Sequence, residues 1–132
     1  MNPPPKQALV LGTGGAAKAV AFALRSMGVA VHFVSRRSGA GIFKTYAQLD
    51  AIDISAHSLI VNATPLGMFP AADDCPPIPY SHITEKHYLY DLVYNPPETL
   101  FMRKGREKGA SAKNGLQMLH LQADKAWEQF RA

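Results

Sequence analysis

Three glycines lie where an apolar run gives way to an alanine-rich segment, in the stretch LGTGGAAKAV at residues 11–20. The spacing Gly12-x-Gly14-x-x-Ala17 is typical of a dinucleotide-binding loop when a strand precedes it and a helix follows. There the first glycine allows a tight turn, the second lets the backbone approach a pyrophosphate, and the small third residue lets the helix pack on the strand. Free amides and the positive end of the helix then face the anion. The alternative is an ordinary strand-to-helix turn with no ligand.

The end of the next apolar run indicates which dinucleotide fits. It reads Ser35-Arg36-Arg37-Ser38 and contains no carboxylate. An acidic residue at this point would bind the ribose hydroxyls of NAD, or those of S-adenosylmethionine in a methyltransferase. An arginine instead can form a forked contact with a 2′-phosphate and can stack on adenine. We therefore expect NADP; the alternative is two solvated arginines on a turn.

Short apolar runs predict the strands that would position these residues. The runs lie at residues 8–11, 29–34, 59–62 and 88–93. Between the first two, apolar residues recur at helical spacing from Ala16 to Met27, and Gly28 stands where a helix would end. Because parallel strands need a crossover of this kind, the sequence predicts a Rossmann-like α/β fold: a doubly wound, mostly parallel sheet with helices on both faces.

The remaining segments are less regular. The stretch IFKTY at residues 42–46 predicts a short strand in place of a full crossover helix, and the prolines between residues 70 and 79 predict a surface loop. Residues 99–108 are expected to form a helix that Gly109 closes. A last amphipathic helix is expected over residues 116–130, with Trp127 and Phe130 as core anchors.

The composition is that of one soluble, folded domain. The chain has 132 residues, of which 47% are hydrophobic and 18% charged, so it can build a core. Its net charge of +4 is mostly dispersed, so we expect no nucleic-acid partner. No apolar run is long enough to cross a bilayer and the first residues do not resemble a signal peptide, so we expect no membrane association and a cytoplasmic location.

Cysteine and histidine give no sign of a metal site. Cys75 is the only cysteine, which rules out an internal disulfide and a cysteine-based metal site, and we expect it to be an inert loop residue. Five histidines lack the spacing of metal ligands: His32, His57, His82, His87 and His120. The sequence therefore predicts no bound metal.

Several stretches resemble one family, the shikimate dehydrogenases, and within it the C-terminal NADP-binding domain. They are LGTGGAAKAV, SRRS, LIVNATPLGM, YDLVYNPPETLF and NGLQMLHLQADKAW, in family order from about residue 7 to residue 131. Many oxidoreductases share the glycine loop, whereas NATPLGM followed by YDLVYNP and GLQMLHLQA is specific. The resemblance implies the reduction of 3-dehydroshikimate to shikimate with NADPH, on the route through chorismate to the aromatic amino acids.

The resemblance also implies roles for individual residues. Those that would hold the pyrophosphate are Gly12, Thr13, Gly14, Gly15 and Ala16. Those that would hold the adenosine 2′-phosphate are Ser35, Arg36 and Arg37. Further residues would lie beside the cofactor or approach its nicotinamide through their backbone: Thr64, Leu92 and Gly115. The substrate, which is shared with another domain, would be bound by Tyr94 and Gln122.

Some of these residues have simpler alternative roles. Thr64 would otherwise cap the end of a strand, Tyr94 would be a half-buried aromatic, and Gln122 would be a polar residue on an exposed helix face. Asp91, a lone carboxylate in the stretch YDLVY, is interpreted as structural.

Two features depart from the family. An arginine or lysine often follows the phosphate-binding arginine three or four residues on, but Gly39 and Ala40 stand there, and Arg37 is expected to substitute. The family's catalytic lysine and aspartate belong to an N-terminal substrate domain to which no part of this sequence corresponds. We therefore expect residues 1–6 to be a linker, residues 7–132 to be an NADP-binding domain without catalytic residues, and the isolated chain to be inactive.

Two other functions remain open at this point. One is a related quinate/shikimate dehydrogenase that uses NAD, although the paired arginines and the missing acid speak against it. The other is a stand-alone NADP-binding module, against which the presence of Tyr94 and Gln122 counts. The sequence leaves the oligomeric state undetermined.

Overall fold

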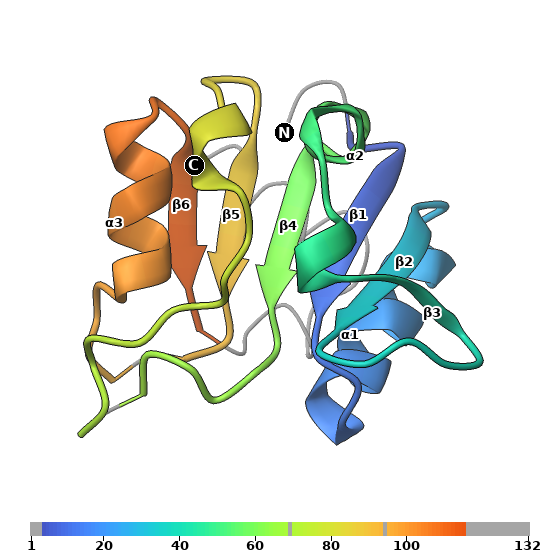
Figure 1. The fold of residues 1–132 in the computed structure, drawn as a ribbon, viewed down its shortest axis with the longest axis horizontal. Helices are drawn as coiled ribbons and strands as arrows, with labels where there is room; N and C mark the ends of the chain where they lie inside the picture. The colour runs from blue at the N-terminus through green and yellow to red at the C-terminus, as the bar shows by residue number, and fades with distance from the viewer. Residues whose placement is uncertain (1–3, 69, 94, 116–132) are drawn as a thin grey trace.

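The computed structural model describes residues 4–68, 70–93 and 95–115. Its centre is one sheet of six parallel strands in the order β3-β2-β1-β4-β5-β6 (Figure 1). The strands are β1 (Gln7–Leu11), β2 (Ala30–Ser35), β3 (Ile42–Thr45), β4 (Leu59–Asn62), β5 (Tyr88–Asp91) and β6 (Ser111–Asn114). The strand order reverses direction between β1 and β4, which makes this the topological switch point of a doubly wound fold.

Helices cover both faces of the sheet (Figure 1). They are α1 (Gly15–Ser26), α2 (Ala51–Ala56) and α3 (Leu100–Glu107), with single turns η1 (Tyr46–Gln48) and η2 (Tyr80–His82). In β1, Ala8 and Val10 face the core on the α1 side, whereas Leu9 and Leu11 face the core formed with α2 and α3. Because both faces are buried, the strand is apolar at every one of these positions, and the predicted Rossmann-like fold is confirmed.

The four predicted strands are confirmed: β4 matches its expected range, and the ends of β1, β2 and β5 differ from theirs by at most two residues. The predicted short strand in IFKTY is also confirmed as β3, and α3 begins one residue later than expected because Thr99 is its N-cap. One strand and one α-helix were not predicted. They are β6, which has only one buried apolar residue, and α2, a six-residue helix opened by reciprocal hydrogen bonds between Asp50 and Asp53.

Residues 36–41 connect β2 to β3 without a helix. The loop at residues 70–79 contains no strand or helix, as its prolines predict. The expected C-terminal helix at residues 116–130 lies outside the described residues. None of the helices in the described ranges is long and apolar enough to span a bilayer.

Candidate functional site

The carboxyl ends of the parallel strands meet at one edge of the sheet, and most of the predicted cofactor residues lie there. Backbone hydrogen bonds tie successive loops to the neighbouring strand: the Gly12 amide donates to the Val34 carbonyl (2.9 Å) and the Ala63 amide to the Leu11 carbonyl (3.0 Å). In the same way the Leu92 amide donates to the carbonyl of Asn62, the last residue of β4, and the Gly115 amide donates to the carbonyl of Asp91, the last residue of β5. This edge is where open α/β sheets bind their ligands.

Gly12 is the point of closest approach between the first loop and the loop after β4. Its φ of +111° lies in a region that residues with a Cβ rarely adopt. A Cβ at this position would lie 3.2 Å from the Ala63 carbonyl oxygen and 3.2 Å from Cγ2 of Thr64. Gly12 is therefore required by the protein itself, whatever ligand is bound.

The two following glycines lie in open space. Gly14 is the N-cap of α1, and no side chain caps the helix. A Cβ on Gly14 or Gly15 would meet no atom within 4 Å. The first turn of α1 holds no acidic residue, so nothing in it opposes the positive end of the helix dipole. These exposed helix-end amides fit a pyrophosphate, which needs donors and room for close approach.

The neighbouring residues agree with this arrangement. Ala17 is fully buried against the sheet, as expected for a small residue that lets the helix pack closely. Thr13 and Ala16 are exposed at the mouth of the loop.

At the end of β2, Arg36 and Arg37 are exposed and Ser35 is half-buried. The Arg37 amide donates to the Ser35 hydroxyl (3.4 Å), which bends the chain into a turn. Within the described part of the chain, neither arginine forms an ion pair. Burial raises the pKa of Tyr46 to about 12, and the positive charge of Arg36 opposes that rise.

A buried polar network supports the other half of the edge. The Asn62 amide group donates to Asp91 Oδ1 (3.1 Å), the Val93 amide donates to the same oxygen (2.9 Å), and the Thr99 hydroxyl donates to Asp91 Oδ2 (2.6 Å). Thr99 Oγ1 also accepts from the Met102 amide and so caps α3. Asp91 therefore holds β4, β5 and α3 together, in agreement with its interpretation as structural.

The environment of Asp91 has opposing effects on its charge. Burial raises the pKa of Asp91 to about 6, and the hydrogen bonds from Thr99, Val93 and Asn62 counteract part of that rise. The sequence indicated a structural role for Asp91 but not its hydrogen-bond partners, Asn62 and Thr99. Signals for them were present: Asn62 is a polar residue at the end of an apolar strand, and Thr99 is a preferred N-cap type.

Thr64 lies at the switch point, as the resemblance implies, but its hydroxyl is already engaged. It donates to Asn62 Oδ1 (2.6 Å) and accepts from the Leu66 amide (3.2 Å), so it shapes the loop after β4. Its cofactor contact stays a prediction.

Leu92 is buried directly after β5, and Gly115, with φ +111°, follows β6. They therefore lie at the predicted edge, and their approach to the nicotinamide stays a prediction. Tyr94 and Gln122 lie outside the described residues.

His32 and His57, away from this edge, form internal contacts. His32 Nδ1 and His57 Nε2 lie 2.7 Å apart, and His57 Nδ1 lies 2.6 Å from the Asp53 carbonyl oxygen. Burial lowers the pKa of His57. Among the residues that the structure describes, no three histidine, cysteine or acidic side chains gather as metal ligands.

Comparison with known proteins gives a consistent result. No protein-family model matches the chain. A shikimate dehydrogenase (NADP(+)) of Desulforamulus reducens is 35% identical over 96% of this chain and 50% of its own length. The crystal structure of shikimate 5-dehydrogenase from Thermus thermophilus in complex with NADP(H) and shikimate is 33% identical, with a TM-score of 0.70 over 93% of this chain and 48% of that one.

A quinate dehydrogenase from Corynebacterium glutamicum in complex with NAD is 26% identical, with a TM-score of 0.67 over 95% of this chain and 49% of that one. The chain thus spans about half the length of the relatives it matches. By sequence and by fold, this chain is similar to shikimate dehydrogenases over about half of their length.

Proposed function

We propose that this chain is the NADP-binding part of a shikimate dehydrogenase, the enzyme that reduces 3-dehydroshikimate to shikimate with NADPH on the route to chorismate. One observation carries the proposal: the uncapped, glycine-lined start of α1 lies at the same sheet edge as two arginines without ion-pair partners among the described residues. NAD and NADP both contain a pyrophosphate, and the additional 2′-phosphate distinguishes NADP from NAD. The relatives named above support this choice.

The exposed backbone amides of residues 13–16 would bind the pyrophosphate, and Gly12, whose own amide donates to Val34, would make the turn that presents them. The 2′-phosphate would be bound by Ser35, Arg36 and Arg37. The bound cofactor supplies the hydride, and the chain binds and orients it. The Asn62–Asp91–Thr99 network holds the loops after β4 and β5, from which Thr64 and Leu92 would contact the cofactor. Gly115 would approach the nicotinamide, and Tyr94 and Gln122 would bind substrate.

Reduction of a ketone also needs a proton donor. Asp91 is the carboxylate nearest to the edge in the described strands, but both of its oxygens accept hydrogen bonds and it is fully buried. We therefore propose that the proton-transfer groups belong to the part of the family that this chain does not match, and that the chain binds NADP without turning over substrate by itself.

Calorimetric titration with NADP and with NAD tests the cofactor assignment. A charged hydrogen bond contributes roughly 1.5 to 3 kcal/mol, so NADP should bind about tenfold more tightly than NAD, or more. Arg36→Asp should abolish that preference, whereas Arg103→Asp, an equal charge change at an exposed position on α3, should keep it. Because a phosphate contact is electrostatic, raising the salt concentration should weaken NADP more than NAD. Equal affinities in the unmodified chain would contradict the assignment.

The quinate dehydrogenase neighbour that binds NAD defines the alternative. That function predicts tighter binding of NAD and no loss on Arg36→Asp. A hydride-transfer assay with shikimate, NADP and the purified chain provides a second test, because turnover would show that the chain carries its own proton donor.

A further inference from the structure

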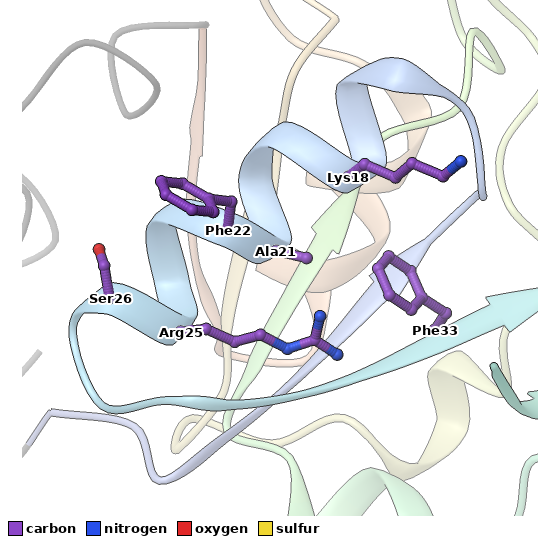
Figure 2. Close-up of a pocket in the computed structure, with 6 residues that line it drawn as sticks. All are labelled: Lys18, Ala21, Phe22, Arg25, Ser26 and Phe33. Carbon is purple, nitrogen blue, oxygen red and sulfur yellow. The ribbon is translucent and has the colours of Figure 1, made fainter.

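A surface hollow lies beside α1, on the side that faces β2. It is lined by Lys18, Ala21, Phe22, Arg25, Ser26 and Phe33 (Figure 2). Parallel strands are usually connected by a helix, which would cover such a flank. Here residues 36–41, all of which are described, contain no helix. This flank of α1 is therefore open to a ligand at the sheet edge.

Arg25 shows which stripe of α1 faces β2. Its guanidinium donates to the Val31 carbonyl (3.3 Å) and lies 5.5 Å from the centre of the Phe33 ring. Lys18 precedes Arg25 by seven residues, which is about two helical turns, so it belongs to the same stripe. Both side chains line the one hollow.

The antiparallel course of α1 and β2 places Lys18 nearer to the carboxyl edge. Seven helical residues span about 10.5 Å, and about three strand residues span the same length. Since Arg25 contacts β2 at Val31 and Phe33, Lys18 lies at the level of the strand's last residues. Helical side chains also tilt toward the helix N-terminus. In Figure 2, Lys18 extends away from Arg25 toward the arrowhead of β2.

The charges around this point favour an anion. Lys18 is exposed and, within the described ranges, forms no ion pair. Asp50 and Asp53 both form ion pairs with Lys44, whose Nζ lies 3.9 Å from Asp50 Oδ2 and 2.7 Å from Asp53 Oδ2. Successive residues of a strand point to opposite faces, so Ser35 shares the face of Phe33. By the same alternation Arg36 is directed to the face of Val34, against which Tyr46 packs. A group bound at Ser35 would thus have Arg36 on one side and Lys18 on the other.

We infer that Lys18 is the second cation of the 2′-phosphate site, opposite Arg36, and so a determinant of the preference for NADP; this inference rests on the proposed function. The ammonium group of Lys18 would supply the second positive charge opposite the 2′-phosphate dianion. Residues 39 and 40 carry no charge and cannot supply it. Arg37, which the sequence suggested for this task, becomes the lesser contributor.

The test compares the affinities of NADP and NAD, which differ only in the 2′-phosphate. Lys18→Met keeps the length and helix propensity of the side chain and should weaken NADP binding about five- to tenfold while leaving NAD within about twofold. Lys18→Arg should restore NADP binding. Lys86→Met removes the same charge from an exposed position before β5 and should change neither affinity. Circular dichroism confirms that each variant is folded.

The outcomes separate two failures. Binding of neither nucleotide by the unmodified chain overturns the proposed function, and the inference with it. The second failure concerns Lys18 alone. It is shown if the unmodified chain binds NADP more tightly than NAD, Arg36→Asp abolishes this difference, and Lys18→Met leaves it unchanged. The role of Lys18 is also overturned if Lys18→Met weakens NADP and NAD binding equally. The same holds if Arg37→Met weakens NADP binding and Lys18→Met does not.

Discussion

The two halves of the sheet's carboxyl edge use their polar groups in opposite ways. After β1 and β2 the chain presents uncapped helix amides and two arginines without carboxylate partners in the described structure. After β4 and β5 the polar groups form hydrogen bonds within the protein: Asn62 and Thr99 both donate to Asp91, and Asn62 also donates to a backbone carbonyl. The first half is built to bind something outside the protein, and the second to hold the edge in place.

This difference follows from burial. Exposed amides and guanidinium groups are solvated by water until a ligand replaces it, so leaving them unpaired costs little. Asp91 is fully buried, and an unpaired polar group there would cost several kcal/mol. No buried side-chain nitrogen or oxygen among the described residues lacks a hydrogen-bond partner. Substitutions in the supporting half should therefore change stability, and those in the open half should change binding.

The largest expected effect is that of Asp91→Ala. It removes the common acceptor of the Asn62 amide, the Val93 amide and the Thr99 hydroxyl. Each orphaned donor costs about 1 to 3 kcal/mol, partly offset by loss of a buried charge, so the free energy of unfolding should fall by roughly 4 kcal/mol. Urea denaturation measures the change. Glu98→Ala removes an exposed carboxylate that is paired with Arg106 and should change stability by less than about 1 kcal/mol.

The second effect is a pH dependence. Burial raises the pKa of Asp91 from 3.8 to about 6, so the folded chain keeps this proton to higher pH than the unfolded chain does. The contribution of Asp91 to stability is therefore fully present below about pH 4 and is lost as the pH rises through 6. The rise of this pKa from 3.8 to about 6 corresponds to at most about 3 kcal/mol of stability.

Asp91→Asn isolates this contribution, because an amide can still accept from Asn62 and Val93 while donating to Thr99 Oγ1. We expect the unfolding free energy of the unmodified chain, minus that of Asp91→Asn, to fall between pH 4 and pH 7. Other titrating groups, such as His57, contribute equally to both. A difference that stays constant, or rises with pH, would show that the hydrogen bonds outweigh the effect of burial.

The comparison also explains how far the sequence could predict the structure. The glycine loop and the apolar runs are local patterns, and they correctly predicted β1, α1, β2 and the α/β class. The unpredicted β6 has a single buried apolar side chain, Ala112, so its place is determined by pairing with β5. The start of α2 did have a local signal, because Asp50 and Asp53 have the spacing of a capping box, but it was not recognised as a helix start.

The supporting network is a different case. Asn62 and Asp91 lie 29 residues apart, and only the pairing of β4 with β5 brings them together. The sequence therefore indicated that Asp91 was structural without indicating which groups it binds. Similarly, the place of Lys18 relative to β2 depends on the packing of α1, which no local pattern specifies.

The smallest effect on stability, and the sharpest contrast, is expected within the glycine loop itself. Gly12→Ala introduces a Cβ 3.2 Å from the Ala63 carbonyl oxygen at a φ of +111°, so it should lower the free energy of unfolding by about 2 kcal/mol. Gly15→Ala adds a Cβ in open space at the first helical position and should raise stability by up to about 0.5 kcal/mol, because alanine is the better helix former. Denaturation of the two variants without nucleotide measures this difference.

Titration with NADP then separates support from binding. Gly15→Ala should weaken NADP binding several-fold although the variant is as stable as the unmodified chain, because the added methyl group occupies the space through which a pyrophosphate reaches the helix amides. If Gly15→Ala binds NADP as tightly as the unmodified chain, the open space in front of α1 is not the place where the pyrophosphate lies.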